Sequence, residues 1–119
     1  MAAPALPESP LPPCPATPNC YRESRTFDRP PAKLFTDALA RLRELSGLTI
    51  GHAVEIERDG DRLSLHATFK VLFFTDDFDL RVAPHAGGAV VHVRSASRVG
   101  AGDLGTNRRR VRAFLDGLA

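Results

Sequence analysis

Between residues 50 and 97, apolar and polar side chains alternate, and short turn-forming segments separate the alternating runs. In the clearest run, polar residues stand between Leu63, Leu65, Ala67, Phe69 and Val71. A period of two places successive side chains on opposite faces of a β-strand, so each run predicts a strand with one apolar face. The segments Asp59-Gly60-Asp61 and Gly87-Gly88 are typical of hairpin turns. The pattern therefore predicts consecutive antiparallel strands, the last of them over residues 89–97.

Helical periodicity flanks this region on both sides. A helix is predicted over residues 31–46, where two prolines precede the first turn and Gly47 follows the last. Its apolar face is formed by Leu34, Ala38, Leu42 and Leu45. A second helix is predicted over about residues 104–117, with Asp103 as its N-cap. The apolar face of this second helix is formed by Leu104, Val111, Leu115 and Leu118.

The order of these elements predicts the fold class. A short strand over Tyr21–Phe27 would precede the first helix, and four strands and the final helix would follow. Consecutive hairpin strands between helices are typical of α+β domains. We expect an antiparallel meander sheet of four to five strands, with a helix in the N-terminal half and a C-terminal helix packed on one face. This topology is similar to that of START-like helix-grip domains.

The first 20 residues differ in composition from the rest. They hold seven of the ten prolines, which disfavour helix and central strand, so we expect a largely irregular Pro-rich arm over residues 1–20. Residues 21–119 form a chain segment of single-domain size, and we expect one α+β domain there.

The two cysteines, Cys14 and Cys20, lie at the end of this arm. Three states are open for them: free thiols, a disulfide closing a small loop, or ligands of a metal ion. Their spacing, without a second cysteine pair, is poor for zinc, and no metal site is expected.

The sequence also bears on where in the cell the protein is located. The longest apolar run, Val71–Phe74, is far shorter than the roughly 20 residues that span a bilayer. The N-terminus has neither the basic nor the apolar region of a signal peptide, so a cytoplasmic location is expected. An extracytoplasmic location is the alternative if a leader has been removed.

The segment from Arg94 to Arg112 concentrates positive charge. It carries six arginines and one acid, Asp103, so a solvated face or an anionic partner is expected. The chain has one Tyr and no Trp, and aromatics do not interleave with the basic run, which disfavours nucleic-acid binding. No glycine-rich nucleotide motif is present.

The same segment predicts a polar corner between the last strand and the last helix. Alternation places Ser95 and Ser97 on the core face of the strand. Helical spacing aligns Asp103, Asn107 and Arg110 on one face of the helix. One alternative is a structural network in which Arg110 pairs with Asp76 or Asp77. The other is an anion site that uses backbone N–H groups near Gly100, Gly102 and Gly105.

Two adjacent acids in one turn, Asp76 and Asp77, add carboxylates to the candidate site. The four histidines are spread over different predicted strands, and no catalytic motif is evident. We therefore expect no cofactor and no catalytic residue. The candidate ligand-binding residues are Asp76, Asp77, Arg94, Ser95, Ser97, Arg98, Asp103, Asn107 and Arg110.

Three motifs carry a family resemblance. They are Cys14-Pro15-x-x-Pro18-Asn19-Cys20, Phe74-x-Asp76-Asp77 and Arg94-Ser95-x-Ser97-Arg98-x-Gly100-x-x-Asp103-x-Gly105-x-Asn107-x-x-Arg110. From about Cys14 to the C-terminus the chain resembles domain-of-unknown-function family 1499. The resemblance implies a bacterial or plastid-related protein, often exported or membrane-attached, although this sequence shows no export segment. It implies no known activity, substrate or catalytic residue.

Three functional hypotheses follow. The first is a non-enzymatic module that binds a small molecule, such as an anion, or a protein, with a cleft between sheet and final helix reaching Ser97 or Arg98. The second is a hydrolase-like enzyme that uses Asp76, Asp77, Asp103 and Arg110. The third is a scaffold in which the polar corner is purely structural.

Overall fold

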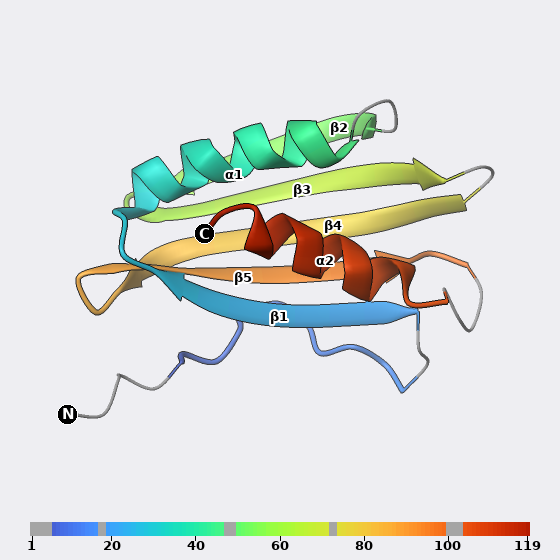
Figure 1. The fold of residues 1–119 in the computed structure, drawn as a ribbon, viewed down its shortest axis with the longest axis horizontal. Helices are drawn as coiled ribbons and strands as arrows, with labels where there is room; N and C mark the ends of the chain where they lie inside the picture. The colour runs from blue at the N-terminus through green and yellow to red at the C-terminus, as the bar shows by residue number, and fades with distance from the viewer. Residues whose placement is uncertain (1–5, 17–18, 47–49, 72–73, 100–103) are drawn as a thin grey trace.

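The computed structural model describes residues 6–16, 19–46, 50–71, 74–99 and 104–119, with side chains except those of 46, 50–55 and 71. All the strands pair antiparallel in one sheet of order β1-β5-β4-β3-β2 (Figure 1). The α+β meander with two helices is therefore confirmed. In chain order the elements are β1 (Cys20–Phe27), α1 (Pro31–Ser46), β2 (Ile50–Asp59), β3 (Arg62–Val71), β4 (Phe74–His85), β5 (Gly88–Ser97) and α2 (Thr106–Asp116).

Two-residue turns set the register of the hairpins. Ala86 and Gly87, between β4 and β5, both have positive φ, at 48° and 83°, as a type I′ turn requires. The turn thus lies one residue before the predicted Gly87-Gly88. Gly88 begins β5, where a Cβ atom would collide with the carbonyl oxygen of Phe27 on β1.

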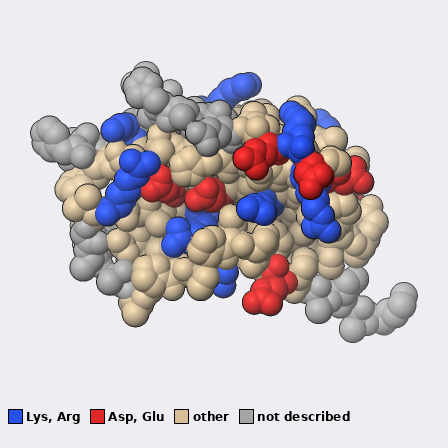
Figure 2. Space-filling view, turned by 180° about the vertical axis from the view of Figure 1, so that it is seen from behind, with Lys and Arg blue, Asp and Glu red and all other residues tan. Residues whose placement is uncertain are grey.

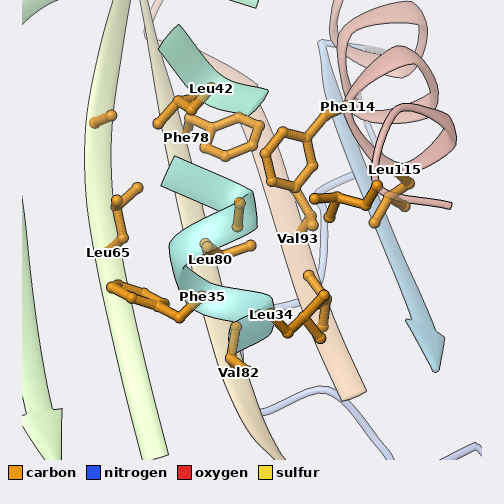
Figure 3. Close-up of a cluster of buried hydrophobic side chains, with 14 of the residues drawn as sticks. Leu34, Phe35, Leu42, Leu65, Phe78, Leu80, Val82, Val93, Phe114 and Leu115 are labelled. Atoms are coloured by element: carbon orange, nitrogen blue, oxygen red, sulfur yellow. The ribbon is translucent and has the colours of Figure 1, made fainter. Parts of the chain in front are cut away.

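The hydrophobic core lies between the sheet and the two helices, which cover the same face (Figure 1). Three rings fill its centre: Phe78 packs edge-on against Phe69 and Phe114, with centroids 5.6 and 5.2 Å apart. Figure 3 shows Phe114 of α2 pointing at Phe78 of β4. Burying a side chain of this size contributes about 2 kcal/mol. The space under α2 is thus filled by aromatic rings.

The N-terminal arm, described over residues 6–16, runs behind the sheet in Figure 1, on the face opposite the helices. We call this the arm face. Arg22 donates to the carbonyl oxygen of Leu11 at 2.8 Å, and Arg94 donates to that of Pro12 at 3.0 Å. Of the three cysteine states left open, the structure has the disulfide between Cys14 and Cys20.

The start of α2 differs from the prediction. Its N-cap is Gly105, with φ of 80° and no side-chain capping hydrogen bond, so the predicted Asp103 cap was wrong. Asp103 itself lies outside the described residues. Leu104 precedes the helix, has φ of 54° and is 96% exposed, so it does not belong to the apolar face. Helical spacing holds only within the helix, and the chain turns at Leu104-Gly105 before α2 begins.

Candidate functional site

The predicted polar corner forms where β4 and β5 meet the first turns of α2. Of the residues predicted to form it, Ser95, Ser97, Asn107 and Arg110 lie together, and Asp103 lies outside the described residues. We use the name polar corner for these four residues and Asp76, which pairs with Arg110. Alternation along β4 and β5 points Asp76 and the two serines toward the helix side, because they share a face with the buried apolar residues of their strands. Asn107 and Arg110 lie three residues apart on α2 and therefore face the same way.

Asn107 is the centre of this corner and is fully buried. Its Nδ2 donates to Ser97 Oγ at 2.9 Å and to the carbonyl oxygen of Asn19 at 3.1 Å. Its Oδ1 accepts from Ser95 Oγ at 2.7 Å and from Arg110 Nη1 at 2.9 Å. One side chain thus ties α2 to β5 and to the residue before β1.

Arg110 completes the network. Its Nη2 forms an ion pair with Asp76 Oδ2 at 2.9 Å, and these two side chains are only 10% and 5% exposed. Its guanidinium also lies 4.5 Å from the ring centroid of Phe69, a cation–π distance. The polar groups of the corner are therefore engaged with one another, which leaves them little capacity for an added ligand.

Three of the other candidate residues, Asp77, Arg94 and Arg98, lie on the arm face, and Asp103 lies outside the described residues. Arg98 donates from Nε and Nη2 to the two oxygens of Asp77, each at 2.9 Å. These hydrogen bonds lower the pKa of the Asp77 carboxyl, and they outweigh the opposing effect of partial burial. His66 lies between Asp77 and Asp79, with nitrogen–oxygen distances of 3.4 and 2.7 Å. Arg94 holds the arm.

The predicted site is thus divided between two faces of one sheet. Asp76 and Asp77 are adjacent in β4, so their side chains point to opposite faces, toward Arg110 and Arg98 respectively. The two carboxylates do not converge.

A cavity of about 490 Å³ lies on the arm face, between the arm and the sheet. A volume of this size is in the range of small-molecule sites. None of the residues that line it is among the candidate site residues predicted from the sequence. Its walls are formed by Pro7, Glu8, Pro10, Glu57, Arg58, Asp59, Arg62, Leu63, Ser64, Arg81, Val82, Ala83, Pro84, His85, Val90 and His92. We call this cavity the arm groove.

One register row crosses the floor of the arm groove. Glu57 pairs with Ser64, Ser64 with Arg81, Arg81 with His92, and His92 with Ser24. A single row of polar residues therefore runs over all five strands. Seen from this side, acidic and basic side chains lie close together on the surface (Figure 2).

His92 is the buried member of the row. It is 3% exposed, and its Nδ1 lies 2.6 Å from Ser24 Oγ. Burial lowers the pKa of its imidazole, and the nearby positive groups Arg22, Arg81 and His85 lower it further. Basic side chains therefore gather around His92, at the β4–β5 side of the groove.

Several groove residues have polar groups without partners inside the protein. His85 Nε2 is buried and has no hydrogen-bond partner. Within the part of the chain that the structure describes, the side chains of Glu57, Asp59, Arg62 and Arg81 form no ion pair. The alternation of side chains along each strand is enough to place the row on one face of the sheet. The cavity could not be predicted, because no periodicity in the sequence indicates where the arm packs.

The described residues contain neither a cluster of candidate metal ligands nor a candidate membrane-spanning helix. Nowhere in these segments do three or more His, Cys, Asp or Glu residues gather as a metal site would require. None of the described helices combines the length and the apolar character needed to cross a membrane.

Solved structures with similar folds are distant in sequence. Protein CV1439 from Chromobacterium violaceum has a TM-score of 0.52 and 13% identity, and the match covers 86% of this chain and 96% of that one. Ara h 8.0201 has a TM-score of 0.47 and 16% identity, covering 83% and 90%. TTHA0849 from Thermus thermophilus has a TM-score of 0.41 and 14% identity, covering 83% and 93%. The first likeness shows a shared fold.

A search of curated proteins finds no match. The family described as "Protein of unknown function (DUF1499)" matches residues 10–118, which include the disulfide, the polar corner and most of the arm groove. That match spans nearly the whole chain, and the protein therefore belongs to the DUF1499 family.

Proposed function

We propose that this protein is a non-enzymatic module that binds a small molecule in the arm groove. The observation that carries the proposal is a cavity of about 490 Å³ whose lining includes His85, with its buried Nε2 atom that has no hydrogen-bond partner. Leaving a buried polar atom unsatisfied is costly, and a bound ligand would satisfy it. The charged side chains beside it, Glu57, Asp59, Arg62 and Arg81, are exposed and can contact the same ligand. In this proposal the polar corner positions α2 and does not itself bind the ligand.

The geometry favours this site over the cleft expected beside the final helix. Phe69, Phe78 and Phe114 occupy the space between the sheet and α2, whereas the arm groove and a smaller cavity beside it lie on the arm face. The geometry also disfavours the hydrolase alternative, because Asp76 and Asp77 face opposite sides of the sheet, each bound to an arginine.

A thermal-shift screen of small anions, cations and zwitterions tests the proposal, together with native mass spectrometry of the gently purified protein. We expect at least one compound to raise the melting temperature in a concentration-dependent way. Ser64→Tyr, which fills the groove floor with a residue that suits a strand, should keep the fold and lose that shift.

Ser97→Ala is the matched control, since it alters the polar corner and leaves the groove intact. We expect it to lower the melting temperature while keeping the ligand-induced shift. A shift that survives in Ser64→Tyr, or a screen in which no compound has an effect, would contradict the proposal.

A further inference from the structure

The arm groove has two oppositely charged sides. Glu57 and Asp59 project from β2, and alternation places both on the arm face. Arg62 of β3 and Arg81 of β4 lie on the same face, and His85 and His92 line the groove beyond them. The negative side is thus the sheet edge at β2, and the positive side is toward β4 and β5.

Among the described residues, these charged side chains form no close ion pairs with one another. Glu57 and Arg81 both flank Ser64 in the register, yet no ion pair joins them, and Asp59 forms none with its register partner Arg62. Since neighbouring strands lie about 4.8 Å apart, the backbones of β2 and β4 are separated by about 10 Å. Ser64 lies between them, so its small side chain leaves space on the groove floor.

Two features of the positive side suit an anionic group, with His85 in the tautomer that carries its proton on Nε2. His85 Nε2 is buried without a partner, so a ligand atom there would gain a hydrogen bond that the protein does not supply. The arginines Arg62 and Arg81 can offer several N–H donors to a carboxylate or phosphate. The position of Arg81 and His85 near His92 agrees with this assignment.

From this arrangement we infer that the arm groove recognises a small zwitterion, with an ammonium group held by Glu57 and Asp59 and a carboxylate or phosphate held by Arg62, Arg81 and His85. The inference rests on the proposed function and adds the chemical class of the ligand. A ligand of one charge would satisfy one side of the groove and leave the charges of the opposite side unpaired.

Isothermal titration calorimetry with matched probes tests the inference. The probes are 4-aminobutanoate, its single-charge analogues butanoate and butylammonium, and 2-aminoethyl phosphate. We expect at least one zwitterion to bind about tenfold more tightly than either single-charge analogue. The ratio between 4-aminobutanoate and 2-aminoethyl phosphate then distinguishes a carboxylate ligand from a phosphate ligand.

Variants that remove one charge test which side of the groove binds the anionic group and which side binds the ammonium group. Arg81→Gln should weaken zwitterion and butanoate binding by about tenfold and leave butylammonium binding unchanged. Glu57→Gln should weaken zwitterion and butylammonium binding and leave butanoate binding undiminished. Lys70→Gln removes an exposed cation that lies on β3 outside the groove lining, and should change none of these affinities.

Two results would overturn the inference: no measurable binding of either zwitterion at millimolar concentration, or equal binding by zwitterions and single-charge analogues. Either result leaves the proposed function standing if another compound still stabilises the protein and Ser64→Tyr still abolishes that effect. If, in addition, no compound stabilises the protein, or Ser64→Tyr does not abolish the stabilisation, both the inference and the proposed function are overturned.

Discussion

At the scale of single residues, Asn107 shows how much depends on one buried amide. It makes hydrogen bonds with Ser95, Ser97, Arg110 and the backbone of Asn19, and it is fully buried. Removing it leaves several buried groups without partners, and each such group costs about 1–3 kcal/mol.

We therefore expect Asn107→Ala to lower the free energy of unfolding by about 2–4 kcal/mol, measured by urea denaturation. Thr36→Ala, a polar-to-Ala change on the exposed surface of α1, is the control and should cost less than about 1 kcal/mol. An effect of Asn107→Ala no larger than that of the control would contradict the network described for the corner.

His92 predicts a pH dependence of stability. Its pKa in the folded protein is lowered by burial and by Arg22, Arg81 and His85, so below its usual pKa of about 6.5 the unfolded chain binds the proton first. Stability from this group is therefore present at pH 7 and is lost as the pH falls below about 6.5. We expect urea denaturation at pH 7 and pH 5 to show a smaller loss in His92→Gln than in the original protein; equal losses would refute the assignment.

The corner residues could be predicted because two periodicities meet there. Alternation fixes the face of Ser95 and Ser97, and helical spacing fixes the face of Asn107 and Arg110. The partner of Arg110 stayed open because Asp76 and Asp77 were predicted to lie in a turn, where alternation does not apply. That prediction was wrong: both residues lie in β4, and alternation along this strand places Asp76 on the helix side, opposite Ser97 of β5.

At the scale of elements, the strands and α1 follow from patterning, whereas the arm does not. A proline-rich segment has no periodicity that would indicate which face it packs on. Its position depends on tertiary contacts from Arg22 and Arg94 to backbone carbonyls, and on the link from Cys14 to Cys20. The position of the arm over the groove could therefore not be predicted from the sequence.

The disulfide should hold the arm against the sheet. Closing so short a loop is worth about 2 kcal/mol in the loop-entropy model. We expect the double variant Cys14→Ser, Cys20→Ser to lose about that much stability and to be cut within residues 6–16 by a protease at lower concentration than the parent. Equal cleavage of the two proteins would show that the arm is held without the disulfide.

At the scale of the whole molecule, the two faces of the sheet do different things. The helix face is filled by a close-packed core, and the polar corner seals one end of it. The arm face carries a row of polar residues beneath a cavity. Replacing Phe78 by Ala should therefore destabilise the fold by about 3–5 kcal/mol, whereas Ser64→Tyr should leave stability nearly unchanged. Comparable losses in thermal melting would contradict this division.

NMR mapping of backbone amides tests the central claim most directly, with the protein titrated by each of a set of small anions, cations and zwitterions. The arm-groove account predicts that a binding compound shifts amides in residues 57–64 and 81–92 and leaves those of 107–110 unchanged. Shifts centred on residues 95–98 and 107–110, or no shifts from any compound, would contradict it.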